Sequence, residues 1–225
     1  MTRIIEVEKQ CAVCGSNNTY SQILSSICFG FRDLDRRPPM LQRLTINFWV
    51  NTCPSCGYCS RDISKIIGNA SKIVYSDYYQ KQLNNPEFPE LANKFLCLSL
   101  LYENNSNYPE AGRACLHAAW ACDDVAAYDC AQTCRQKAIS LLLTGKEKGQ
   151  NFAEKRGEEI ALLVDLMRRS KQFEVALKTC EEGLKKHLNK DILCILEFQR
   201  KLIMKQDCDC HKISEAIKKQ KTKRK

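Results

Sequence analysis

The amino-acid sequence predicts an α+β protein, with a small β-rich metal-binding region at the start of the chain and mainly α-helices after it. Two Cys-x-x-Cys-Gly motifs lie within the first 60 residues, and β-branched and aromatic residues gather between them. From about residue 90 onward, apolar residues recur at helical spacing. We therefore expect a metal-binding domain at 1–62, a helical connector at 63–89, a helical domain at 90–211 and a flexible basic tail at 212–225.

The two cysteine motifs predict one closed metal site. A gap of two residues lets both sulfurs of a motif reach the same ion, and the glycine that follows each motif permits the positive φ of a tight turn. Four thiolates would leave no position for water or substrate, which indicates a structural rather than a catalytic role. The expected ligands of one structural zinc ion are Cys11, Cys14, Cys53 and Cys56.

Other cysteines leave alternatives open. Cys59 extends the second motif to Cys53-x-x-Cys56-x-x-Cys59, so iron is the alternative metal. Cys28 and Cys59 are otherwise spare thiols that could respond to oxidation. Near the other end of the chain, Cys208, Cys210 and His211 could form a partial metal site, with His187 as a further ligand. Their one-residue gap favours an ordinary helix-end turn instead.

Strand-like runs at 19–27 and 44–52 predict the order motif, strand, loop, strand, motif, which is that of a zinc ribbon. The spacer between the motifs is long, and its excess falls in a loop that includes 32–39, Arg-Asp-Leu-Asp-Arg-Arg-Pro-Pro. Its arginines could recognise a carboxylate or a phosphate. They could equally form ion pairs within the loop, and the sequence does not separate these two interpretations.

The helical half contains an internal echo at a displacement of 65 residues. Seven apolar or small residues recur at the same offsets, with small ones where two antiparallel helices would approach closely. The pattern resembles the tetratricopeptide repeat, and it implies a degenerate middle unit around 125–143 and a last helix at 192–204. The first set is Phe95, Leu98, Ser99, Tyr102, Ala111, Cys115 and Ala118, and the second is Ile160, Leu163, Val164, Met167, Ala176, Cys180 and Gly183.

That resemblance also implies a surface for a partner, because the first helices of tetratricopeptide-like stacks line a concave face that binds peptides. Carried over by register, the expected partner-binding residues are Asn93, Asp165, Arg168 and Arg169, with Leu96, Leu100 and Glu103 on the same face. The two adjacent arginines would receive an acidic peptide or a C-terminal carboxylate.

The formal net charge of +9 is concentrated at the end of the chain, where residues 212–225 carry +6. This basic tail could contact nucleic acid without sequence specificity. Residues 1–10 lack an apolar signal-peptide core, and no apolar run is long enough to cross a bilayer, so we expect a cytoplasmic location, reduced thiols and no membrane partner.

Evidence for catalysis is weak. The three histidines belong to no visible motif, and His117 lies beside Trp120 on an expected helix, where a packed core position is the simpler interpretation. The sequence contains neither a phosphate-binding glycine loop nor a nucleophile elbow, so we expect no enzyme.

Three stretches, FRDLDRRPPMLQRLTINFWVNTCPSCGY, FPELANKFLCLSLLYENNSNYPEAGRACLHAAWACDD and LLVDLMRRSKQFEVALKTCEEGL, resemble a family of conserved bacterial proteins. That family is catalogued as a domain of unknown function with an N-terminal Cys-x-x-Cys pair and tetratricopeptide-like helices. The resemblance implies that the four cysteines bind metal, and it implies no activity. We expect a non-catalytic protein–protein interaction module or adaptor with a protein or peptide partner. The alternatives are a nucleic-acid-binding factor and a thiol-based redox switch, and the oligomeric state stays open.

Overall fold

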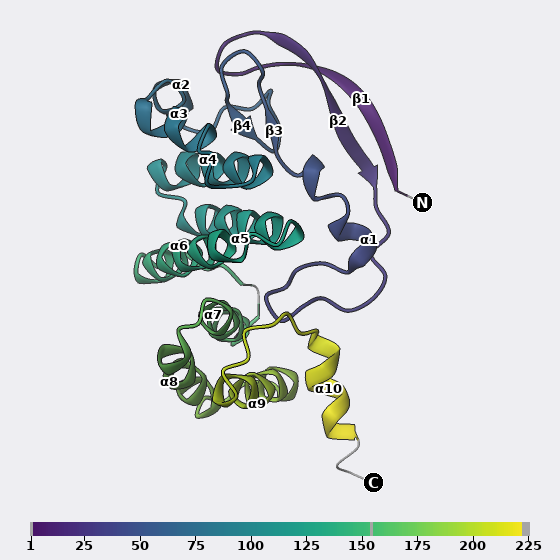
Figure 1. The fold of residues 1–225 in the computed structure, drawn as a ribbon, viewed down its shortest axis with the longest axis vertical. Helices are drawn as coiled ribbons and strands as arrows, with labels where there is room; N and C mark the ends of the chain where they lie inside the picture. The colour runs from purple at the N-terminus through teal and green to yellow at the C-terminus, as the bar shows by residue number, and fades with distance from the viewer. Residues whose placement is uncertain (1, 154, 222–225) are drawn as a thin grey trace. The chain divides into compact units, whose positions relative to one another are not determined.

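The computed structural model describes residues 2–153 and 155–221 (Figure 1). The chain divides into two compact units. Unit 1 consists of Met1–Cys28 and Leu41–Gln150, and unit 2 consists of Phe29–Met40 and Asn151–Lys225. The segment 29–40 therefore folds with the C-terminal part of the chain, although both of its ends continue into unit 1. This division is not the one expected from composition, which placed 29–40 inside the metal-binding domain.

Unit 1 begins with two small antiparallel sheets, each made of one hairpin. Strand β1 (Arg3–Gln10) pairs with β2 (Asn17–Ser25), and β3 (Asn51–Thr52) pairs with β4 (Cys59–Ser60). Each cysteine motif forms the turn of one hairpin. The true order is strand, motif, strand, given twice, and not the predicted order of motif, strand, loop, strand, motif.

One of the two strand predictions needs correction. The run 44–52 forms a strand only at its end, because Ile46–Phe48 is a 3-10 helix (η1) preceded by a short helix α1 (Met40–Arg43). Thr45 explains this locally: its hydroxyl donates to the Gln42 carbonyl oxygen (2.7 Å) and accepts from the Trp49 indole N–H (2.9 Å). Such bonds from side chains to nearby groups compete with an extended backbone.

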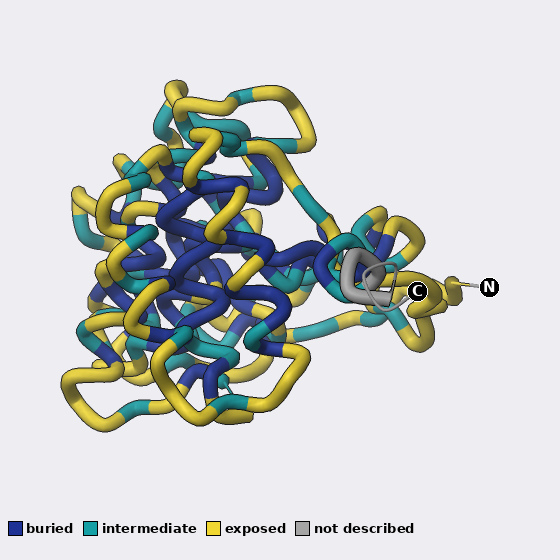
Figure 2. The backbone as a smooth tube through the Cα atoms, turned by 90° about the horizontal axis from the view of Figure 1, so that it is seen from below, coloured by how far each residue is buried: buried dark blue, intermediate teal, exposed yellow. Residues whose placement is uncertain are grey.

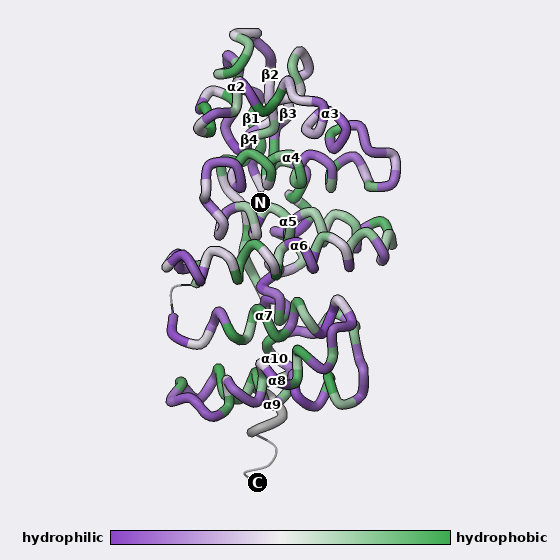
Figure 3. Tube along the Cα trace, turned by 90° about the vertical axis from the view of Figure 1, so that its left-hand side faces the viewer, coloured by the Kyte–Doolittle hydropathy of each residue, from purple (hydrophilic) through white to green (hydrophobic). Residues whose placement is uncertain are grey.

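The rest of unit 1 is helical. Two short helices, α2 (Ala70–Ile73) and α3 (Asp77–Leu83), precede three long ones, α4 (Glu90–Asn104), α5 (Tyr108–Asp124) and α6 (Tyr128–Glu147). These long helices carry hydrophobic and hydrophilic residues side by side (Figure 3), and buried residues alternate with exposed ones along the helical turns of the chain (Figure 2). The buried residues of α4, α5 and α6 form the core of unit 1. The α+β class expected from the sequence is confirmed.

Unit 2 contains helices α7 (Glu158–Arg169), α8 (Phe173–Leu184), α9 (Lys190–Met204) and α10 (Ile213–Lys221). Asn189 caps α9, because its side-chain oxygen accepts a hydrogen bond from the Ile192 N–H (2.9 Å). The segment 29–40 is joined to this unit by an antiparallel bridge between Asp33 and Lys212. We call residues 29–40 the strap.

Four helices of the two units end in the same turn. The C-terminal residue after the cap has positive φ at Ser106 (56°), Ala126 (58°), Lys171 (63°) and Gln206 (54°). In each case the next N–H reaches back five residues to a carbonyl, as from Gln172 to Met167 (2.9 Å). This is the Schellman motif, which satisfies carbonyl groups that the helix leaves open.

The echoed positions lie at corresponding places in the α4–α5 and α7–α8 hairpins. All fourteen residues are buried except Tyr102, which is half-buried. Gly183 shows why small residues recur: a Cβ placed there would lie 2.8 Å from Cγ2 of Ile160. Corresponding positions are therefore buried within each hairpin, and α6 also buries small residues, at Ala131 and Ala138.

Among residues 2–153 and 155–221, no helix is both long enough and apolar enough to cross a bilayer.

Candidate metal centre

The four cysteines of the two motifs converge. Their Sγ atoms all lie within 4.8 Å of one another, with Cys11 3.8 Å from Cys56 and Cys14 3.6 Å from Cys53. A tetrahedral zinc site with Zn–S bonds of about 2.3 Å has sulfur–sulfur separations of about 3.8 Å. The four side chains therefore fit a tetrahedral metal ion. Within the described part of the chain, this is the one group of three or more such side chains close enough to share an ion.

The two motifs have the same backbone geometry. In the first, the Cys11 N–H donates to the Ser16 carbonyl (2.8 Å), and the Gly15 N–H donates to the Cys11 carbonyl (2.9 Å). The second repeats both bonds at the same offsets, from Cys53 to Tyr58 (2.9 Å) and from Gly57 to Cys53 (2.8 Å). Gly15 and Gly57 have φ of +75° and +80°, which glycine adopts without strain. Each glycine thus closes a turn that presents two sulfurs on one side.

Ser16 joins the two motifs. Its hydroxyl lies 3.2 Å from Sγ of Cys14 and 3.3 Å from Sγ of Cys53. Burial acts to raise the pKa of Cys53, but hydrogen bonds from Ser16 and from the Cys56 and Ser55 N–H groups outweigh it and lower that pKa to about 6. The Ser16 hydroxyl is also the main cause of the lowered pKa of Cys14. Thiolates at these two positions are therefore favoured, which is the form that binds a metal.

At the other two positions the effect of burial prevails, and it raises the pKa of both Cys11 and Cys56. A bound divalent cation would favour the thiolate at these positions, because its charge lies next to the sulfur. The site thus combines two sulfurs that ionise readily with two that need the ion, and metal binding there should release protons.

Side chains of helix α3 hold the second motif through hydrogen bonds to its backbone. The Tyr79 hydroxyl donates to the Gly57 carbonyl (3.0 Å) and accepts from the Cys59 N–H (3.0 Å). The Gln80 side-chain amide donates to the Cys56 carbonyl (3.3 Å). The first motif is held in turn by the Ala12 N–H, which donates to the Ile63 carbonyl (3.0 Å). These supporting residues were not foreseen, because no local pattern links them to the cysteines.

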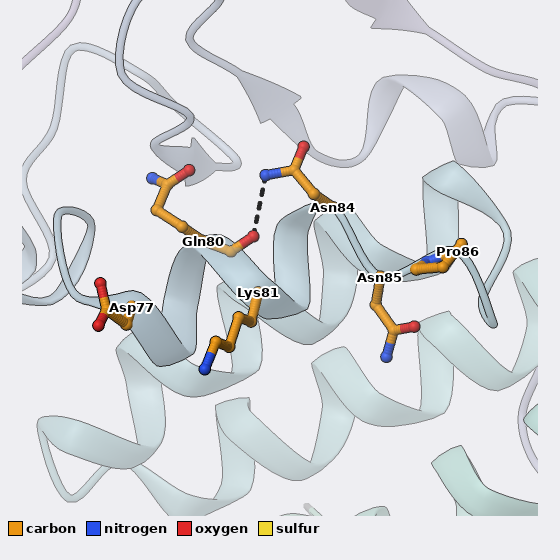
Figure 4. A pocket seen from close by; sticks show the side chains of 6 residues that line it. All are labelled: Asp77, Gln80, Lys81, Asn84, Asn85 and Pro86. Atoms are coloured by element: carbon orange, nitrogen blue, oxygen red, sulfur yellow. Dashed lines mark hydrogen bonds between the residues drawn. The ribbon is translucent and has the colours of Figure 1, made fainter.

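Helix α3 also borders an open pocket of about 570 Å³ (Figure 4). Of its lining residues, Asn84 donates to the Gln80 carbonyl oxygen (2.9 Å), and Lys81 is exposed. The pocket is lined by Asp77, Gln80, Lys81, Asn84, Asn85 and Pro86.

The spare cysteines lie outside the group of four. Cys59 is buried, and its Sγ contacts the Thr52 hydroxyl (3.4 Å) and the Gly57 carbonyl (3.4 Å). Cys28 is exposed. Near the C-terminus, both ring nitrogens of His211 contact carboxylates, Nε2 at 3.0 Å from Asp207 and Nδ1 at 3.1 Å from Glu215. The partial metal site considered for Cys208, Cys210 and His211 is thus replaced by a histidine held between two acidic side chains.

The predicted partner-binding residues have internal partners instead. Asn93 is buried; its side chain donates to the Asn85 carbonyl (2.7 Å) and accepts from Gln82 (2.9 Å). Asp165 and Arg168 are also buried and form an ion pair of 2.9 Å. The three side chains therefore stabilise the fold through internal contacts. Because they are buried, they present no surface to a peptide.

Arg169, the fourth of these residues, pairs with Asp35 of the strap at 2.7 Å. Arg36 pairs with Glu158 at 3.0 Å. The charged loop that the sequence offered as a recognition loop or as a set of internal ion pairs therefore binds helix α7 of the same chain. The sequence predicts that Arg168 and Arg169 receive an acidic peptide or a C-terminal carboxylate of a partner, whereas in the structure the carboxylate that pairs with Arg169 belongs to the same chain.

His117 lies in an aromatic cluster, with ring centroids 4.9 Å from Trp120 and 5.3 Å from both Trp49 and Phe95. Burial, together with the charges of Arg61 and Arg113, lowers the pKa of His117 to about 3. The imidazole is therefore neutral near pH 7 and packs as an aromatic side chain, as the sequence interpretation held.

Comparison of the chain with protein-family models, with curated proteins and with solved structures gives no match. The four-cysteine geometry therefore carries the functional argument on its own.

Proposed function

We propose that this chain is a zinc-stabilised, non-catalytic protein-interaction module. One observation carries the proposal: the four sulfurs of Cys11, Cys14, Cys53 and Cys56 fit a closed tetrahedral site. A site of this kind stabilises a small β region that could not bury enough apolar surface alone. The paired helical hairpins, which resemble tetratricopeptide units, then supply the scaffold for a protein partner.

The metal is tested first, on protein purified anaerobically without chelators. We expect about one zinc ion per chain by mass spectrometry and no visible absorbance. Cys53→Ser should lower the metal content below about 0.2 per chain, whereas Cys28→Ser, which removes an exposed thiol outside the site, should leave it unchanged. Stoichiometric iron with visible absorbance would replace the zinc assignment with the iron alternative and favour a redox role.

The interaction role is tested by co-purification from a cytoplasmic extract, the compartment in which we place the protein because its thiols must stay reduced. The zinc-loaded wild type should retain a specific protein partner that Cys53→Ser loses. If the two proteins retain the same set of proteins, the proposed role fails. Nucleic acid retained through residues 212–225 would favour the alternative function, and its binding should weaken steeply with salt.

A further inference from the structure

The strap belongs to unit 2, but its place in the sequence relates it to the metal centre of unit 1. It lies in the sequence between Cys14 and Cys53, so a metal ion bound by both cysteines closes a loop that contains the whole strap. The strap nevertheless folds with residues 151–225. Any change in the order of this loop therefore acts directly on contacts made in unit 2.

The strap is held in unit 2 by its backbone. The Leu34 N–H donates to the His211 carbonyl (2.8 Å), and the Ile213 N–H donates to the Arg32 carbonyl (2.9 Å). These bonds flank the bridge between Asp33 and Lys212. Leu34 itself is 3% exposed, so the strap also contributes an apolar side chain to the core of unit 2.

Buried charges add to this attachment. Asp35 is fully buried, and its ion pair with Arg169 is shielded from water. A buried ion pair is a weak source of net stability, yet loss of one partner is costly, because the other charge stays buried without compensation. Removal of the strap would leave Arg169 without the carboxylate of Asp35. Burial, with a smaller contribution from the charge of Asp35, also raises the pKa of Asp165 on the same helix as Arg169.

The surface that receives the strap is shaped by another buried residue. Arg168 donates to the Asp207 carbonyl (2.6 Å) and to the Asp209 carbonyl (2.9 Å). It thereby holds the segment before His211 against α7. Helix α7 and the segment 207–213 therefore both contribute to the surface that receives the strap, and the strap is a separate piece of chain within unit 2.

Loop closure gives the direction of the effect. With the metal bound, the hairpins hold both ends of the strap, and little chain entropy is lost when the strap docks. Without the metal, the strap is part of a longer flexible segment, and docking then costs more conformational entropy because more of the chain must become ordered. The metal should therefore favour the docked strap.

We infer that metal occupancy of the four-cysteine site controls docking of the strap, so that metal loss loosens unit 2 and uncovers the surface around Arg169. This inference rests on the proposed zinc site. It makes the metal centre a regulator of unit 2 as well as a local stabiliser of the two hairpins in unit 1.

Hydrogen exchange on the full chain tests the inference, with zinc bound, after chelation and after zinc is restored. We expect chelation to speed exchange at least tenfold in the strap and in residues 207–213, and zinc to reverse it. Exchange in α5 and α6 should change less than twofold. If β1 and β2 lose protection while the strap keeps it, the inference is overturned. Equal loss of protection throughout the chain overturns it as well, because the effect is then global unfolding.

Linkage supplies a second measurement that needs no metal-free protein. If zinc favours the docked strap, weaker docking must lower zinc affinity by the same factor. Asp35→Asn should therefore weaken zinc binding at least fivefold in competition with a chromophoric chelator. Glu103→Gln, which breaks a half-buried ion pair to Lys137 within unit 1, is the matched control. Equal zinc affinity of Asp35→Asn and wild type overturns the inference, whereas absence of zinc from the wild type overturns the proposed function.

Discussion

Ser106 and Lys171 occupy the same left-handed backbone conformation, with φ of 56° and 63°, at the ends of helices α4 and α7. They lie 65 residues apart, which is the displacement of the echoed apolar positions. In both turns the following N–H bonds the carbonyl five residues earlier, at Tyr102 and Met167. The echo in side chains is therefore accompanied by an echo in backbone geometry, and neither turn uses glycine.

Helix α5 ends in the same turn, with Ala126 at the left-handed position. Substitution of Ala126 tests what a residue other than glycine costs there. A residue with a Cβ pays a conformational cost in the left-handed region that glycine avoids. Ala126→Gly should raise the free energy of unfolding by about 0.5 to 1 kcal/mol, after allowance for the greater freedom of glycine in the unfolded chain. Denaturant unfolding measures the difference. Val125→Gly, one residue earlier at φ −113°, should instead be destabilising, and a gain there would contradict the explanation.

Gly183 should tolerate no larger side chain. A Cβ at this position would lie 2.8 Å from Ile160 and 3.0 Å from Leu196. Because both neighbours are in the core, Gly183→Ala should lower the free energy of unfolding by about 1 to 3 kcal/mol. Thermal unfolding provides the measurement. Glu182→Ala, at the exposed neighbouring position, should have an effect below about 0.5 kcal/mol, and equal losses for the two variants would refute the packing argument.

Ser16 should tune the metal site although it is not a ligand. Its hydroxyl contacts the sulfurs of Cys14 and Cys53, and such supporting groups typically contribute 10- to 100-fold to metal affinity. Ser16→Ala should therefore weaken zinc binding about tenfold or more in a chelator competition. Ser55→Ala changes a serine at an exposed position of the other motif and should bind zinc like the wild type. The role of Ser16 would be disproved by equal affinities of all three proteins.

His117 should make stability depend on pH. Its pKa in the folded state is about 3, below the ordinary value of 6.5, so the unfolded chain binds more protons between these values. The contribution to stability is therefore complete above pH 6.5 and is lost as the pH falls towards 3. Between pH 6.5 and 5, unfolding free energy should fall by about 1.6 kcal/mol more in the wild type than in His117→Phe.

The comparison of the two proteins cancels the acid sensitivity of the metal site, which both retain. His187→Gln is the control, because His187 is exposed and should leave the wild-type pH dependence intact. Parallel pH curves for the wild type and His117→Phe would show that the imidazole does not stay neutral in the folded protein.

Local sequence signals predicted the parts of the fold that depend on neighbours in the chain. The Cys-x-x-Cys-Gly turns and the helix that begins at Glu90 need only short-range patterns. The first strand was missed although Ile5 and Val7 alternate with Glu6 and Glu8, a clear period of two. The run 44–52 has strand-forming residues, but the hydrogen bonds of Thr45 turn it into a 3-10 helix.

The sequence could not predict which of the expected partner-binding side chains are exposed, because this depends on contacts between segments far apart in the chain. Arg169 was expected on an open face, and only the folded chain reveals that Asp35 reaches it. The same holds for Asn93, which the carbonyl of Asn85 and the amide of Gln82 satisfy from inside. Exposure at these positions depends on how distant segments meet, and spacing within a helix carries no information about that.

The position of the strap in the sequence also determines the order in which parts of the chain can fold during synthesis. Asp35 and Arg169 are 134 residues apart, so at 5 to 20 residues per second the ribosome adds Arg169 roughly 7 to 27 seconds after Asp35. Cys56, by contrast, follows Asp35 within a few seconds. The nascent chain can therefore capture its metal ion long before the strap has anywhere to dock, and during that wait Leu34 has no core to enter. The four-cysteine site can therefore fold early in synthesis, whereas the strap can dock only after the C-terminal helices have been made.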